Sequence, residues 1–169
     1  MLTKSNLLNF SGCGMLLAFA SAATAQTNAS KAEVTPTIVF VCEHGSAKSV
    51  VAAAHFNRLA RERGLPYRAV SRGIKPDDAI AQGVRTGLAL DGIDVTAWQP
   101  QAVTDKDLGQ AAKVVSLATD LPTTKPFVKS KLVEWNDIPS VRKDYTAARS
   151  AIVERVMKLV ESLAAAQRK

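Results

Sequence analysis

The 169-residue sequence is poor in cysteine, in aromatic residues and in long apolar runs. Aromatic residues make up 5% of the chain and are not interleaved with the basic ones, which argues against a base-stacking, nucleic-acid-binding surface. No run reaches the roughly 18 apolar residues that a membrane-spanning helix needs. What remains is a chain of suitable length for one globular domain with a real core.

Residues 1–25 have the features of a secretory signal peptide. Lys4 supplies a positive charge, residues 14–20 form a short apolar core, and Ala23-Thr24-Ala25 fits the small-x-small cleavage pattern. We predict cleavage after Ala25, a periplasmic or secreted protein, and no stable membrane insertion after cleavage.

Cleavage also changes the number of cysteines in the protein. It removes Cys13 and leaves Cys42 alone, so the mature chain has no internal disulfide framework. A lipoprotein signal at Cys13 is a weaker interpretation, because the apolar core would follow the cysteine instead of preceding it. Cys42 is either a buried small hydrophobe or a reactive thiol, and its neighbours favour the second.

The mature chain divides into a flexible leader, residues 26–35, and one domain, residues 36–169. Within the domain, short apolar runs alternate with amphipathic segments. Strands are expected at 37–41, 67–71, 113–117 and 131–135, and helices at 50–63, 76–91, after Thr104 and from Tyr145. This alternation predicts an α/β three-layer sandwich, with a four-stranded parallel sheet and helices on both faces.

The first strand ends at Cys42, and the loop Glu43-His44-Gly45-Ser46-Ala47-Lys48-Ser49 leads into a helix. Inward-pointing backbone N–H groups of such a loop, together with the helix dipole, bind a tetrahedral oxyanion. They also stabilise a thiolate. We therefore predict Cys42 as a nucleophile, Lys48 as the positive charge beside the anion, and Ser49 as a donor to the sulfur.

The other loop residues have supporting roles. Gly45 can take the left-handed conformation that a closed anion-binding loop requires, and Ser46 offers a hydroxyl. Glu43 opposes an anion unless its side chain points away, and His44 is most simply a loop residue facing solvent. The candidate substrate-binding residues are Glu43, His44, Gly45, Ser46, Ala47 and Ser49.

The spacing of cysteine, five residues, a basic residue and serine between a strand and a helix resembles the low-molecular-weight protein tyrosine phosphatases, whose fold the related arsenate reductases share. Four later segments extend the resemblance over about residues 36–165. They are Ser71-Arg72-Gly73, Gly92-Ile93-Asp94-Val95, the strand 115–120 and Trp135-Asn136-Asp137-Ile138-Pro139. The resemblance implies a phosphatase loop after the first strand and a general acid in the last segment.

Lys48 departs from the family, which has arginine at this position of the loop. Arginine grips two oxygens with a planar fork, whereas lysine offers a point charge. Losing one charge-assisted hydrogen bond costs about 1.5–3 kcal/mol, or roughly 10- to 150-fold in rate. Arg72 is either a substitute for the lost fork or, more simply, a solvated turn residue.

The acid and the substrate wall also depart from the family pattern. Asp137 is the predicted general acid, although Ile138 separates it from the proline that usually follows. The alternative is a turn-forming aspartate, with Asp120 as the reserve acid. The tyrosine-rich wall of the phosphatases is missing, and Trp135 is expected in the core.

Three functions remain open for this site. The first is a phosphomonoester hydrolase of the tyrosine phosphatase type, acting through a cysteinyl-phosphate intermediate with no metal and no cofactor. The second is an arsenate reductase that uses an external thiol, because the mature chain lacks a second cysteine. The third is a weakly active oxyanion-binding module. The formal net charge of +7 suits an anionic substrate in each case.

Overall fold

The structure is a computed structural model that describes residues 35–121 and 125–168. The predicted signal peptide, residues 1–25, lies outside the described residues, as do residues 26–34 of the predicted leader. Within the described part of the chain, no helix has both the length and the apolar character needed to cross a bilayer.

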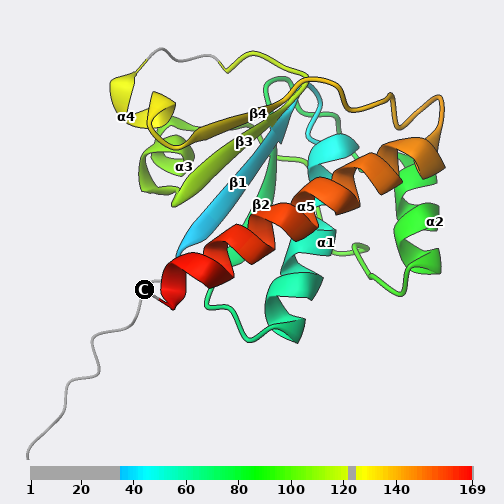
Figure 1. The fold of residues 1–169 in the computed structure, drawn as a ribbon. Coiled ribbons are helices and arrows are strands. Elements are labelled where there is room, and N and C mark those ends of the chain that lie inside the picture. Colours follow the sequence, from blue (N-terminus) through cyan, green and yellow to red (C-terminus); the bar gives the residue numbers. More distant parts are fainter. Residues whose placement is uncertain (1–34, 122–124, 169) are drawn as a thin grey trace, which may run out of the picture. The chain divides into compact units, whose positions relative to one another are not determined.

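Four strands form one parallel sheet in the order β2-β1-β3-β4 (Figure 1). They are β1 (Thr37–Cys42), β2 (Arg68–Gly73), β3 (Lys113–Leu117) and β4 (Leu132–Trp135). β1 is an inner strand and is apolar on both faces, because helices cover both sides of the sheet. The predicted four-stranded parallel sheet is confirmed.

Helices cover the two faces unequally. The helices α1 (Lys48–Glu62), α2 (Gln82–Leu90) and α5 (Tyr145–Gln167) lie on one side, and the short α3 (Asp105–Gln110) and α4 (Pro126–Lys129) lie on the other (Figure 1). Alternate residues of β1 point to opposite faces of the sheet. Ile38 and Phe40 belong to the larger core under α1 and α5, and Val39 and Val41 belong to the smaller core under α3 and α4.

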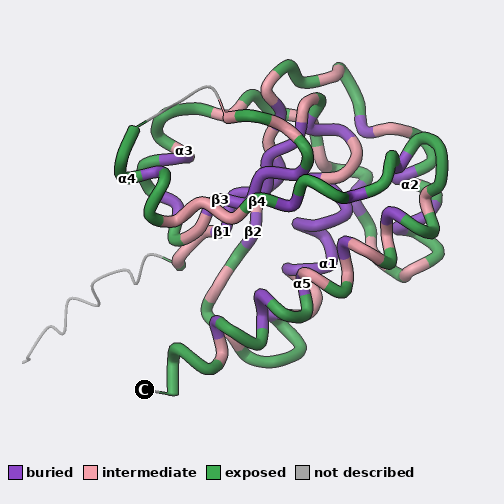
Figure 2. The backbone as a smooth tube through the Cα atoms, turned by 45° about the horizontal axis from the view of Figure 1, so that its top comes forward, coloured by how far each residue is buried: buried purple, intermediate pink, exposed green. Residues whose placement is uncertain are grey.

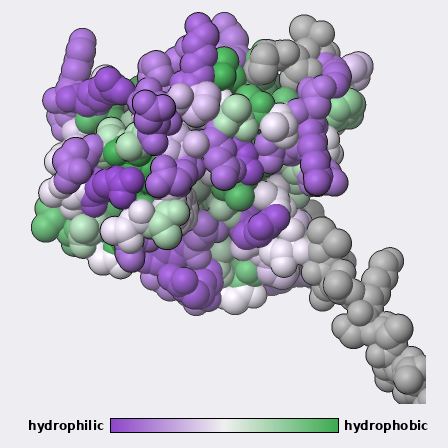
Figure 3. All heavy atoms as spheres, turned by 180° about the vertical axis from the view of Figure 1, so that it is seen from behind, coloured by the Kyte–Doolittle hydropathy of each residue, from purple (hydrophilic) through white to green (hydrophobic). Residues whose placement is uncertain are grey.

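Burial follows this layering. Figure 2 shows buried residues along the strands and on the inward sides of α1 and α5, with exposed residues outside. The buried residues of α5 recur every three or four positions, as the sequence predicts for one apolar helix face: Ala148, Ile152, Val156, Leu159, Val160 and Leu163. The face seen in Figure 3 carries mostly hydrophilic side chains with scattered apolar ones.

The segment before α2 differs from the prediction. The sequence predicts a helix over 76–91, whereas α2 begins at Gln82. Residues 76–81 instead bond to the loop after β1: the N–H of Asp77 donates to the carbonyl of His44 over 3.0 Å, and that of Ala81 to the carbonyl of Ser46 over 3.1 Å. These bonds to a distant segment replace the bonds of a first helical turn.

Candidate active site

The loop after β1 turns its carbonyl groups toward residues 74–81. The carbonyls of Cys42 and Glu43 accept from the N–H groups of Ile74 and Lys75 over 3.1 and 2.8 Å, beside the two bonds described above. Among the described residues, none accepts a hydrogen bond from the N–H groups of Glu43 to Ser49, and no side chain caps α1 at Ala47. These N–H groups are the donors that an oxyanion can use.

Two glycines make the loop possible. Gly45 has a φ of +60°, the left-handed conformation that the sequence predicts. Its backbone also meets that of Gly73 at the end of β2. A Cβ atom on Gly45 would lie 2.8 Å from the Gly73 nitrogen, and one on Gly73 would lie 2.7 Å from the Gly45 nitrogen. Neither position has room for a side chain.

Cys42 and Ser49 lie together where β1 ends and α1 begins. The Sγ of Cys42 is 3.1 Å from the Oγ of Ser49, within the range at which a hydroxyl donates to sulfur. Both residues are buried, and Cys42 is 5% exposed. The contact is the one that the sequence predicts for a stabilised thiolate.

A cavity of about 300 Å³ opens above Cys42. Its walls come from the loop residues up to Lys48, from Leu117 and Ala118 at the end of β3, and from the segment Ser140 to Arg142 before α5. Ala118 has a φ of +49°, a conformation that costs a non-glycine residue about 1 kcal/mol or more. Such strain is common beside functional sites.

Lys48 supplies a cation that no described residue neutralises. Its side chain lines the cavity and is partly buried. In the part of the chain that the structure describes, no hydrogen bond or ion pair involves its ammonium group. The acidic Glu43 is engaged elsewhere, because its Oε2 accepts from the Thr119 hydroxyl over 3.2 Å. An incoming anion would therefore meet an available positive charge.

His44 and Ser46 share one partner, Asp77. The Nδ1 of His44, whose side chain is half-exposed, lies 3.4 Å from Oδ1 of Asp77. The buried Ser46 hydroxyl donates to Oδ2 of the same carboxylate. This bond ties Ser46 to the segment before α2, and Ser46 also belongs to the lining of the cavity. Its role in substrate binding stays a prediction.

Asp137 lies away from the cavity. Its side chain is 76% exposed, and Oδ2 accepts a hydrogen bond from Nη2 of Arg155 on α5 over 2.5 Å. Neither Asp137 nor the exposed reserve candidate Asp120 belongs to the lining of the cavity. The role of Asp137 as general acid stays a prediction.

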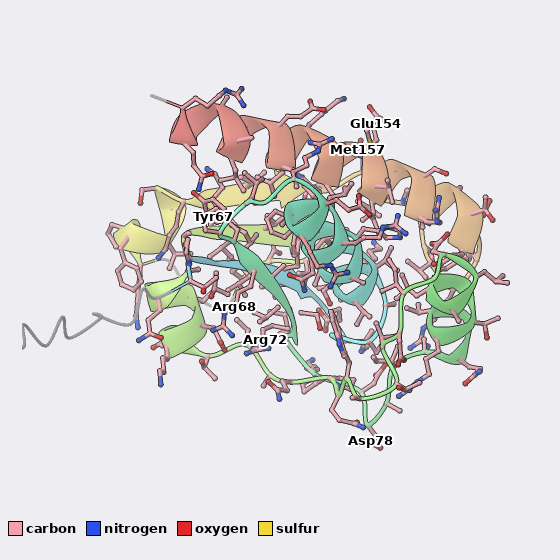
Figure 4. All side chains as sticks on the ribbon, turned by 90° about the horizontal axis from the view of Figure 1, so that it is seen from below. Tyr67, Arg68, Arg72, Asp78, Glu154 and Met157 are labelled. Atoms are coloured by element: carbon pink, nitrogen blue, oxygen red, sulfur yellow. The ribbon has the colours of Figure 1, made fainter. Side chains whose placement is uncertain are left out.

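Arg72 has a third role, which neither sequence interpretation covers. It lies on β2 (Figure 4), and its Nε and Nη2 donate to the two carboxylate oxygens of Asp107 on α3 over 3.1 and 3.0 Å. Burial acts to raise the pKa of Asp107, but hydrogen bonds from Arg72 and Thr104 outweigh it and hold that pKa below its ordinary value. Arg72 is thus tied to α3 and does not reach the loop.

Sequence reasoning missed Asp77 and Arg142. Asp77 falls in the segment that was expected to be helical, and Arg142 falls in a stretch without periodicity. Trp135, in contrast, is buried as predicted, with its ring 5.7 Å from that of Phe40. In the described chain, no group of three or more His, Cys, Asp or Glu side chains could hold a metal ion.

Comparison with known proteins agrees with this geometry. The profile of the low molecular weight phosphotyrosine protein phosphatase family matches residues 37–135. The chain belongs to this family of enzymes. Comparison with curated proteins gives no match.

Solved structures share the fold of this phosphatase family. A low molecular weight protein tyrosine phosphatase from T. tengcongensis has a TM-score of 0.69 and 19% identity, over 75% of this chain and 99% of that one. An arginine phosphatase from Geobacillus stearothermophilus has a TM-score of 0.67 and 20% identity, over 78% and 95%. An arsenate reductase from Archaeoglobus fulgidus has a TM-score of 0.58 and 29% identity, over 73% and 98%.

Proposed function

We propose that the chain is a phosphomonoester hydrolase that acts through a cysteinyl-phosphate intermediate on Cys42. One observation supports this most strongly: the thiol lies 3.1 Å from the Ser49 hydroxyl in a cavity that also holds the unpaired ammonium of Lys48. The hydroxyl stabilises the thiolate, while the free N–H groups and Lys48 hold the phosphoryl oxygens.

The reaction has two steps. In the first, the Cys42 thiolate attacks phosphorus; the S–P bond forms, the bond to the leaving oxygen breaks, and that oxygen takes up a proton. In the second, water attacks phosphorus and the S–P bond breaks, which releases phosphate and restores the thiolate. The proposal assigns neither step to a metal or a cofactor.

We assign the proton of the first step to Asp137, as the sequence predicts. This requires its ion pair with Arg155 to open when substrate binds. Asp137→Asn should then slow hydrolysis of phenyl phosphate by roughly 100-fold or more, and that of p-nitrophenyl phosphate much less, because its leaving group needs no proton. Equal effects on both substrates would reject Asp137 as the general acid. Asp120→Asn, measured on the same two substrates, tests the reserve candidate.

The described lining of the cavity has no feature that selects a tyrosine side chain. None of its described lining residues is Phe, Tyr or Trp, so no aromatic wall stacks on a phenol ring. Phosphotyrosine is therefore expected to be turned over without marked preference over other aryl phosphates.

The deciding experiment is hydrolysis of p-nitrophenyl phosphate under reducing conditions by the full chain. Cys42→Ser should abolish turnover, and Cys13→Ser is the matched control that should retain it. Unchanged turnover in Cys42→Ser would reject the mechanism. No turnover in the unaltered chain, together with phosphate binding, would indicate an oxyanion-binding role instead.

Arsenate reduction with an external thiol is the second candidate, because an arsenate reductase shares 29% identity with the chain. Cys42 would attack arsenate and form an S–As bond as water leaves. A small thiol would then attack the sulfur and form a mixed disulfide with Cys42, while the two electrons of the S–As bond pass to arsenic and release arsenite. A second small thiol would reduce the mixed disulfide and restore Cys42. Release of arsenite in the presence of a small thiol would favour this candidate.

A further inference from the structure

The cation that the loop contributes to the oxyanion site, Lys48, cannot bind two oxygens at once in the way an arginine does. Lys48 lines the cavity without a partner among the described residues, but its ammonium is a point charge. A tetrahedral dianion is held best by a planar pair of donors in addition to backbone N–H groups. A second cation beside Lys48 would complete such a site.

Arg142 provides that cation from a distant part of the chain. It lies between β4 and α5, in the segment Ser140 to Arg142 that forms one wall of the Cys42 cavity. Its side chain is 65% exposed, and Nη2 lies 3.2 Å from Oδ2 of Asp77. Its Nε and Nη1 make no hydrogen bond with any residue that the structure describes, so they remain available to a ligand.

Asp77 links Arg142 to the phosphate-type loop. The oxygen that pairs with Arg142 also accepts from the Ser46 hydroxyl, and the other oxygen lies beside His44. The guanidinium is therefore held beside the loop through one carboxylate, which is a positioning role. Asp78, the next residue, is exposed and lies at the outer edge of this segment (Figure 4).

We propose that Arg142 is a substrate-binding residue that grips the tetrahedral oxyanion opposite Lys48 and so replaces the guanidinium that the loop lacks. The inference rests on the proposed function, because it concerns the same oxyanion site. The ligand class is a tetrahedral dianion such as a phosphate monoester or arsenate. Two cations from different segments share the role that one arginine has in the family loop.

Binding of inorganic phosphate, measured by calorimetry on the full chain, tests the proposal without depending on turnover. Arg142→Gln should weaken phosphate binding at least tenfold, since a hydrogen bond to a charged group is lost. Arg61→Gln is the matched control: it removes the same charge at the far end of α1 and should change affinity less than twofold. Circular dichroism checks that each variant is folded.

Further variants test whether Arg142 and Lys48 bind the oxyanion together or whether Arg142 acts only through its charge. Adding Lys48→Arg to Arg142→Gln should recover most of the lost affinity, and Lys48→Arg alone should improve binding far less. Asp77→Asn should weaken binding more than Asp78→Asn, because Asp77, unlike Asp78, pairs with Arg142.

Three results would overturn the proposal. They are absence of phosphate binding by the unaltered chain, an Arg142→Gln effect no larger than that of Arg61→Gln, and failure of Lys48→Arg to recover affinity. Loss of turnover in Cys42→Ser reports separately on the hydrolase. An inactive chain that still loses phosphate affinity in Arg142→Gln would reject that function and keep this assignment.

Discussion

At the scale of single residues, the contact between Gly45 and Gly73 decides whether the loop around Cys42 can form. The two backbones belong to segments that meet only in the folded chain, and each leaves no space for a Cβ atom on the other. The atoms in the way are backbone atoms, which cannot rotate aside as a side chain can. The site therefore depends on a residue of β2 that does not itself line the cavity.

We expect Gly73→Ala to destabilise the fold by about 1–3 kcal/mol, the usual cost of overpacking, and to reduce turnover by displacing the loop. Gly83→Ala on α2 is the control, because a Cβ there meets nothing within 4 Å. Urea unfolding and p-nitrophenyl phosphate hydrolysis measure the two effects. A Gly73→Ala variant with the stability and rate of Gly83→Ala would contradict the packing argument.

At the scale of elements, a partly buried polar network around His55 joins three helices. Asp91, which ends α2, accepts from Nε and Nη2 of Arg149 on α5 over 2.6 and 2.7 Å. On α1, His55 is fully buried, with Nε2 3.3 Å from Asp91 and Nδ1 3.3 Å from Arg58. Burial, the charge of Arg58 and that of Arg149 outweigh the attraction of Asp91 and lower the pKa of His55 to about 4.

This network gives stability a definite pH dependence. The unfolded chain binds the His55 proton near pH 6.5 and the folded chain only near pH 4, so stability is complete above pH 6.5 and falls as the pH drops toward 4. The loss should reach about 3 kcal/mol. Urea unfolding from pH 7 to 4 should show it, and His55→Gln should flatten the curve. An equal slope in that variant would contradict the assignment.

Protonation of Asp91 lowers the stability of the fold further at lower pH. Hydrogen bonds from Arg149 outweigh burial and hold its pKa below the ordinary value. Its contribution to stability is therefore present at neutral pH and disappears as the pH falls below about 4. The two groups act in successive pH windows, with His55 first.

At the scale of the whole molecule, we propose that the protein is exported. The first 25 residues have the pattern of a cleaved signal, and the proposed hydrolase mechanism uses no cytosolic cofactor. Expression in a Gram-negative host should give a periplasmic protein that begins at Gln26. Ala25→Asp should block cleavage, whereas Ser30→Asp, beyond the cleavage site, should not. A cytosolic protein that keeps residue 1 would contradict the proposal.

The sheet, most helix bounds and the residues around the thiol could be predicted because local pattern determines them. The apolar run before Cys42 and the glycine at position 45 point to a strand and a left-handed turn without knowledge of any distant contact. Asp77 and Arg142 could not be found this way. Asp77 reaches Ser46 across 31 positions and Arg142 across 65, so their roles depend on how the sheet brings remote loops together.

The depth of Cys42 has a further consequence for an exported protein. Cys42 is 5% exposed at the base of the cavity, and it is the one free cysteine of the described chain. A protein disulfide is too bulky to approach it, so mixed disulfides with other proteins should form slowly. Hydrogen peroxide is small enough to enter and to give a sulfenic acid. In an oxidising compartment, shielding of the sulfur by its own fold would then determine how long the protein stays reduced.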